Sequence, residues 1–290
     1  MLGAEFRVSR EIDFSQLDSS KVAMPRYGFG YIAAFPIARN SLQLFGPNGQ
    51  LIYHSELIDS RGVQLKIVDV AIAPSGRVAV AATALGADGK TEAVLAFLSP
   101  SGVIGPLLPH ESFVPLRLRF RSEGELWAVG FSRVESGGHV IRVYDSSGKT
   151  LRSLLPNSDF PGVRHLHVDG ILAPSQVGMA VFLPRVRSLS VYESLDVAPV
   201  QYRNLPIPAD WEVLTASMVE SSKLLLQCLV PSSDASINAV APRVFQLDLL
   251  HLREGLQPLE SEGDKSPAII GSKAGELVRI RGGRVLIGSF

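Results

Sequence analysis

The stretch "IRVYDSSGKTLRSLLP" (141–156) carries the local pattern that decides the fold. Apolar and polar residues alternate in "IRVY", as in a half-buried β-strand, and a second strand-like segment follows a short turn. The turn ends on Gly148, and glycine readily adopts the positive φ that tight hairpin turns require. The same strand–turn–strand pattern recurs in 42–57 and 95–109, with turn glycines Gly49 and Gly102, and more weakly in 189–206 and 244–260.

A second kind of hairpin lies upstream of these outer hairpins. It is found in "VDVAIAPSGRVAVAAT" (68–83) and "LRLRFRSEGELWAVGF" (116–131), and its rhythm continues in 168–183 and 214–229. One unit therefore has four strands, an inner hairpin followed by an outer hairpin. The equivalent outer-turn positions 49, 102, 148 and 196 are separated by 53, 46 and 48 residues. Four-stranded units at this period are typical of β-propeller blades.

We therefore predict an all-β protein with a single domain over 1–290, a six-bladed β-propeller with four antiparallel strands per blade. Strands from both termini are predicted to close the ring, because 5–15 and 266–290 have strand character and neither forms a whole blade. Five blades with unrelated ends, or seven with one degenerate blade, are the alternatives. The predicted blades span approximately 20–66, 67–112, 113–160, 161–209, 210–262, and 263–290 completed by 1–19.

The outer hairpin at 141–156 resembles the one that recurs in bacterial six-bladed propellers of the NHL-like and TolB-like kind. Their shared pattern is a hydrophobic-x-V-Y/F-D-x-x-G-K/R strand–turn–strand, whereas the Asn-His-Leu signature is missing here. The resemblance implies the fold, and it favours a periplasmic or secreted location. Such propellers serve as interaction platforms, lactonases, lyases and sugar or quinone enzymes, so the fold alone leaves the function open.

The charge balance argues against two classes of partner. Lys plus Arg and Asp plus Glu each number 28, which gives no basic footprint for nucleic acid or for an anionic membrane surface. No apolar run reaches membrane-spanning length, and the start of the chain as given has no signal-peptide stretch. One cysteine, Cys228, excludes an internal disulfide. No phosphate-binding or dinucleotide-binding motif occurs, so we predict no cofactor.

The inner hairpins suggest where a ligand would bind. Aligned on their turns, they place Asp69, Arg117, Asp169 and Thr215 at one equivalent position. The first strand of a propeller blade borders the central channel, so we predict that this parity, which also includes Ala71, lines a polar channel. The opposite parity is predicted to pack between blades. The candidate ligand-binding residues are Asp69, Arg117, Arg119, Arg121, His165, His167, Asp169, Thr215 and Ser217.

Acidic residues flank the arginines on the neighbouring inner strands. Such an order fits a set of internal salt bridges, and it also fits an anion site if the arginines keep donors free. "VRHLHVDG" (163–170) could offer two histidines to a metal, but a site needs three or four ligands and the adjacent arginines repel a cation. We predict no metal. No nucleophile-elbow motif surrounds any serine, so no catalytic residue is predicted.

Taken together, these features favour a non-catalytic binding or scaffold propeller with an unknown protein or small-molecule partner. Its polar central channel could hold a small anionic ligand. The alternative is a channel-based enzyme of the lactonase, hydrolase or lyase type that acts on an anionic small molecule or a carbohydrate. No nucleic-acid partner and no membrane insertion are expected.

Overall fold

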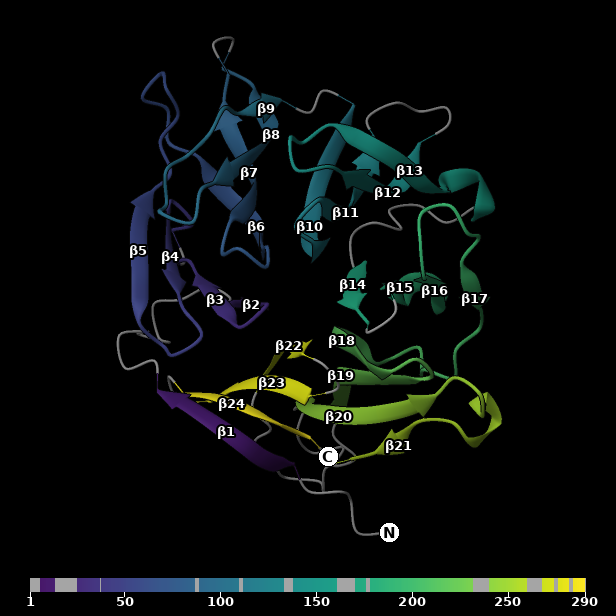
Figure 1. Ribbon diagram of the computed structural model, residues 1–290. Coiled ribbons are helices and arrows are strands. Elements are labelled where there is room, and N and C mark those ends of the chain that lie inside the picture. The colour runs from purple at the N-terminus through teal and green to yellow at the C-terminus, as the bar shows by residue number, and fades with distance from the viewer. Residues whose placement is uncertain are drawn as a thin grey trace. The chain divides into compact units, whose positions relative to one another are not determined.

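The computed structural model groups its strands into six four-stranded sheets within the residues that it describes (Figure 1). Contacts between Cα atoms divide the chain into two compact units, 13–172 and 1–12 with 173–290, which we describe separately. The described residues are 6–13, 25–36, 38–86, 89–109, 112–132, 138–160, 170–175, 178–231, 240–259, 268–273, 276–281 and 284–289.

The unit of residues 13–172 contains three complete blades, coloured blue to teal in Figure 1. In each blade the four strands follow one another in sequence and pair in that order. The first blade has β2 (Arg26–Gly28), β3 (Tyr31–Ala34), β4 (Ser41–Phe45) and β5 (Leu51–Glu56); the second has β6 (Lys66–Ile72), β7 (Val78–Leu85), β8 (Thr91–Leu98) and β9 (Leu108–Pro109); the third has β10 (Phe113–Ser122), β11 (Glu125–Ser132), β12 (His139–Tyr144) and β13 (Thr150–Pro156).

The other unit contains the remaining sheets and takes strands from both ends of the chain. Its first two sheets have β14 (Ile171–Pro174), β15 (Met179–Leu183), β16 (Ser188–Tyr192) and β17 (Val200–Tyr202), then β18 (Glu212–Glu220), β19 (Lys223–Pro231), β20 (Val240–Asp248) and β21 (Gln257–Pro258). The last sheet has β22 (Ala268–Lys273), β23 (Glu276–Arg281), β24 (Arg284–Ser289) and β1 (Arg7–Asp13).

The last sheet confirms that both termini complete one blade. Strand β1 lies at its edge beside β24, so the strand order is β1-β24-β23-β22. The Ser9 hydroxyl donates to the Ile287 carbonyl at 2.9 Å, and Arg284 pairs with Glu11 at 2.7 Å. The predicted fold class, an all-β six-bladed β-propeller, is therefore confirmed, and the five-bladed and seven-bladed alternatives are wrong.

The outer hairpin turns have the predicted backbone geometry. Gly49, Gly102 and Gly148 have φ of 84°, 83° and 85°. In each turn the glycine N–H donates to the carbonyl three residues earlier, as Gly102 does to Ser99 at 2.9 Å. Gly102 also packs on the preceding blade, where a Cβ atom would lie 2.7 Å from the Tyr53 ring. The glycine is thus required both for the turn and for the contact between blades.

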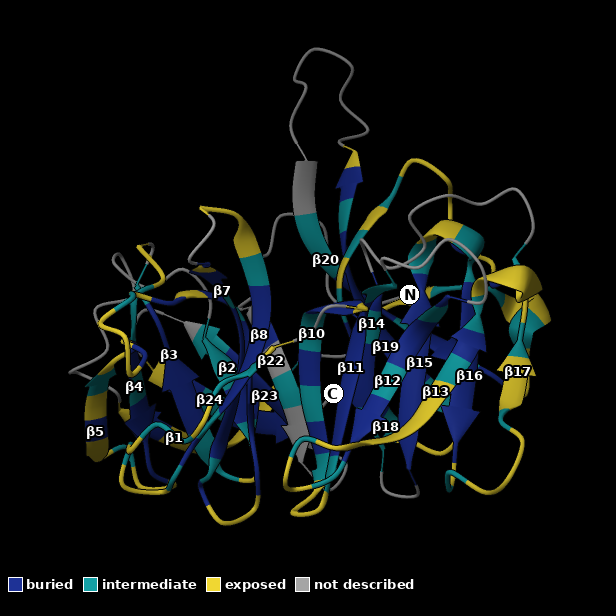
Figure 2. Ribbon diagram, turned by 90° about the horizontal axis from the view of Figure 1, so that it is seen from above, coloured by how far each residue is buried: buried dark blue, intermediate teal, exposed yellow. Residues whose placement is uncertain are grey.

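Side chains from adjacent blades form the cores, and the outer edge strands are exposed. Figure 2 shows buried middle strands and exposed stretches on edge strands such as β13. Strand β6 is buried on both faces: Ile72 packs toward the first blade, and Ala71 packs with Leu118 and Phe120 of the third. The prediction that the Ala71 parity faces a wet channel is wrong, because both faces of this strand lie between blades.

Candidate functional site

The inner strands share a β-bulge that sets the direction of their side chains. The register shifts by one residue just before Asp69 in β6, before Arg117 in β10 and before Thr215 in β18. These three residues therefore hold the same position in their blades, as the alignment on the turns places them. Bulges re-aim side chains and are common beside functional sites.

Asp69 joins the three inner strands of the unit that contains it. Its Oδ1 accepts from Arg26 Nε of β2 at 2.6 Å, and its Oδ2 accepts from the Leu118 backbone N–H of β10 at 2.8 Å. Sequence analysis expected Asp69 to line a polar channel. In the structure its side chain is only 2% exposed and is not open to solvent. Each carboxylate oxygen of Asp69 thus accepts a hydrogen bond, and these bonds compensate for the loss of water around the buried charge.

Arg119 has a different environment from Arg26. It is half-buried on β10, and it makes no hydrogen bond or ion pair with any residue in the described part of the chain. The pKa of Arg119 is lowered to about 10, mainly by burial and also by the positive charges of Arg26 and Arg117, while Asp69 acts in the opposite direction. Arg119 therefore stays charged at neutral pH, without a counter-ion of its own among the described residues.

Arg26, Arg117 and Arg119 together form what we term the arginine cluster. Arg117 donates from Nη1 to the Leu116 carbonyl at 3.0 Å, a contact within its own strand. Among the described residues, three guanidinium groups thus face one carboxylate, that of Asp69. These four described residues carry an excess of two positive charges, which attracts anions and repels metal cations.

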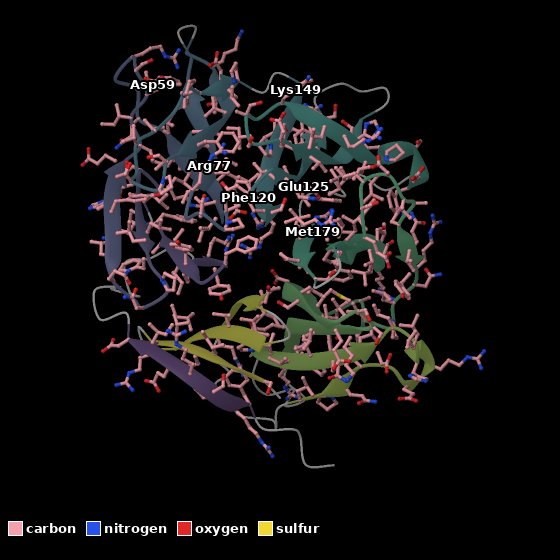
Figure 3. All side chains as sticks on the ribbon, in the orientation of Figure 1. Asp59, Arg77, Phe120, Glu125, Lys149 and Met179 are labelled. Carbon is pink, nitrogen blue, oxygen red and sulfur yellow. The ribbon has the colours of Figure 1, made fainter. Side chains whose placement is uncertain are left out.

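Arg121 belongs to another set of contacts. A second register shift follows Phe120, so the alternation of β10 is broken at Arg121. Its Nη1 donates to both oxygens of Glu125 at 3.3 and 3.4 Å, and Trp127 Nε1 donates to Glu125 Oε1 at 2.6 Å. Figure 3 labels Phe120 and Glu125 of this hairpin. The structure therefore separates Arg121 from the arginine cluster, with which sequence analysis grouped it.

The remaining sequence candidates lie elsewhere. His165, His167 and Asp169 are outside the described residues. Ser217 is buried and Thr215 is half-buried on β18 of the other unit. In this blade Gln227 pairs with Thr215 in register, and its side-chain oxygen accepts from the Ile269 N–H at 3.1 Å. An uncharged side chain therefore makes the kind of hydrogen bond to the next blade that Asp69 makes in the other unit.

Arg26 is the site residue that sequence analysis missed. The first inner hairpin, "RYGFGYIAAF" (26–35), turns at Phe29 and Gly30, and its first strand has only three residues. The glycines of this hairpin were the one feature of the sequence that could have indicated a close contact between its first strand and the next blade. A Cβ atom at Gly28 would lie 2.9 Å from the Ile72 carbonyl oxygen, so glycine lets β2 approach β6 and brings Arg26 to Asp69.

Two other kinds of chemistry find no support in the described residues. These contain no group of three or more His, Cys, Asp or Glu side chains placed to hold a metal. Burial raises the pKa of Cys228 to about 12, so this thiol stays protonated and unreactive at neutral pH. The described helices include none with the length and apolar character to cross a membrane.

The fold and site define a six-bladed β-propeller with a basic cluster on its inner strands. Among solved structures, the chain is similar to YCF48 bound to D1 peptide. The two sequences are 11% identical, the match covers 100% of this chain and 98% of that chain, and the TM-score is 0.51. A protein of unknown function from Bacteroides caccae has 11% identity, coverage of 79% and 78%, and a TM-score of 0.47. At this identity the first likeness supports the fold alone. No protein-family model and no curated protein matches the chain.

Proposed function

We propose that this chain is a non-catalytic binding propeller that holds an anionic group of its ligand at the arginine cluster. The observation that carries the proposal is Arg119, a half-buried cation without an ion-pair or hydrogen-bond partner among the described residues. Removing a charge from water is unfavourable unless a counter-charge or hydrogen bonds compensate. A ligand anion supplies both.

The neighbouring ion pair shows what a structural arginine looks like in the same place. Arg26 has a buried carboxylate partner, and the second oxygen of that carboxylate accepts a backbone N–H. Arg119 lies beside this pair and adds positive charge that Asp69 does not neutralise. An arginine of this kind destabilises the unliganded fold, and its presence is accounted for by binding.

Two likenesses support a binding role at the level of fold. The outer hairpin at 141–156 resembles NHL-like and TolB-like propellers, which include interaction platforms. YCF48, which shares the fold, was solved with a peptide bound. Propellers commonly use a rigid ring of blades to position binding groups, although fold likeness by itself does not assign a ligand.

The test is a thermal-shift comparison of the whole chain in sulfate, acetate and chloride at matched ionic strength. Binding to the native state raises the melting temperature. Sulfate also stabilises proteins by exclusion from their surface, so the informative quantity is the shift of the native chain minus that of Arg119→Gln. Arg203→Gln, which changes an exposed arginine bonded to Gln201, is the matched control and should respond as the native chain does. Equal shifts in all three proteins would refute the proposal.

A further inference from the structure

The arginine cluster has far more hydrogen-bond donors than acceptors. A guanidinium has five N–H donors. Arg26 uses the Nε donor for Asp69, Arg117 uses Nη1 for the Leu116 carbonyl, and Arg119 uses none within the described residues. Among the described residues, the terminal nitrogens of Arg26 and all the nitrogens of Arg119 therefore have no hydrogen-bond partner.

These donors can be reached from solvent. Arg26 is 12% exposed and Arg119 is half-buried, and the nitrogens of neither are among the described polar atoms that are sealed from solvent without a hydrogen bond. Donors in this setting can bind a group that enters from solution. They are also partly withdrawn from water, so each bond to a charged acceptor is stronger than it would be on an open surface.

The two arginines approach from opposite sides of one strand. Arg26 is on β2 and Arg119 is on β10, and β6 with Asp69 packs against both strands. The charge of Arg26 lowers the pKa of Arg119 more than does that of Arg117, which is two residues away on the same strand. The charge of Arg26 thus acts on Arg119 from a neighbouring blade.

We infer that the ligand group is a tetrahedral dianion, of the phosphate-monoester or sulfate kind, held between Arg26 and Arg119. This inference rests on the proposed function and deepens it. Two negative charges balance the excess of two positive charges in the cluster. A planar carboxylate presents two oxygens to one guanidinium fork, whereas a tetrahedral oxyanion has three or more oxygens that can accept from forks on two strands.

Asp69 acts as a positioning residue for this site. It holds Arg26 through Nε, which leaves the two terminal nitrogens of that guanidinium for the ligand. Because its own oxygens accept from Arg26 and from the Leu118 N–H, Asp69 offers little acceptor capacity to a ligand hydroxyl. The cluster therefore favours oxyanions over neutral carbohydrates, whose hydroxyl groups need acceptors as well as donors.

Isothermal titration calorimetry of the whole chain with sulfate, methyl phosphate, acetate and glycerol, at constant ionic strength, tests the inference. At about pH 8 we expect sulfate and methyl phosphate to bind and acetate and glycerol not to bind. The second pKa of a phosphate monoester is about 6, so at about pH 5 methyl phosphate becomes mostly a monoanion. Its affinity should then fall several-fold, while that of sulfate, which stays a dianion, should hold.

Variants locate the site and separate the possible failures. Arg119→Gln should weaken sulfate binding by about tenfold or more, because it removes a charge-assisted fork. The double variant Arg26→Gln with Asp69→Asn removes a charge pair together and should weaken binding to a similar degree, while Arg203→Gln should not. Acetate binding as tightly as sulfate would overturn the dianion and leave the proposed function standing. If no anion binds, or if Arg119→Gln binds sulfate like the native chain, the proposed function fails as well.

Discussion

Replacing Arg119 with glutamine should make the unliganded protein more stable. The substitution keeps part of the side-chain stem and a polar end, and it removes a charge that burial and two neighbouring arginines disfavour. Most substitutions of half-buried residues destabilise a protein, so a gain here would be a distinctive result. It would mark Arg119 as a residue kept for binding.

The magnitude follows from the protonation equilibrium of Arg119. A pKa lowered from 12.5 to about 10 corresponds to about 3 kcal/mol of unfavourable interaction of the charged form. Partial exposure to solvent reduces this figure, and some packing of the stem is lost, so we expect a gain of about 1 kcal/mol. For a chain of this size that is a rise of about 2 °C in melting temperature.

The pH dependence has a definite sign. Because the folded-state pKa of Arg119 lies below the unfolded-state value, the destabilisation is fully present below about pH 10 and is relieved as the pH rises above it. The advantage of Arg119→Gln should therefore be the same at about pH 6 and pH 8 and should shrink above about pH 10.

Urea unfolding in chloride buffer, without sulfate or phosphate, measures the effect. Arg203→Gln is the control and should differ from the native chain by less than about 0.5 kcal/mol, as exposed substitutions usually do. A loss of about 1 kcal/mol or more in Arg119→Gln would mean that this guanidinium stabilises the fold. The reasoning that assigns it to a ligand would then be refuted.

Three further perturbations test the fold and its charges. Asp69→Asn should lower the unfolding free energy by about 3 kcal/mol, because it leaves Arg26, whose side chain is only 12% exposed, without its ion-pair partner; a loss under about 1 kcal/mol in urea unfolding would contradict this. Gly102→Ala should be about 1–3 kcal/mol more destabilising than Gly62→Ala, since both have positive φ but only the former has a neighbour within 4 Å; equal losses would rule out the packing term. The hydrogen bond that protonated His251 donates to Asp248 raises the pKa of His251, so an NMR titration should show this pKa falling in Asp248→Asn; an unchanged pKa would show that the pair is not formed in solution.

The fold could be predicted from sequence because its signals are local. Gly102 and Gly148 mark hairpin turns by a backbone requirement that depends on a few neighbouring residues. Counting back from the inner turns placed Asp69 and Arg117 at equivalent positions because each lies the same number of residues before its turn glycine, and in the structure both directly follow a bulge. Spacing from a recognisable turn can be aligned without knowledge of the packing.

The site was predicted only in part because it depends on contacts between blades. Arg26 reaches Asp69 from 43 residues earlier in the chain, through a close approach of β2 to β6 that the sequence does not display as a repeat. Alternation along β6 also could not distinguish a wet face from a packed one. Both faces of β6 lie between blades. Ala71 lies on the face that was expected to be polar, and there it packs with Leu118 of the next blade.

The described residues of the cluster suit the proposed binding role. Acid–base catalysis needs a group that can exchange a proton near neutral pH and is within reach of the substrate. Asp69 is buried with both oxygens accepting hydrogen bonds, and Arg119 stays protonated at neutral pH, so these residues can bind and orient an anion without transferring a proton. Arg119→Gln separates a binding role from a structural role. If Arg119 serves binding, the variant should be more stable than the native chain, and sulfate should no longer raise its melting temperature by the binding contribution. Under the proposed function, the same cation accounts for a weakness of the unliganded fold and for binding of a dianion.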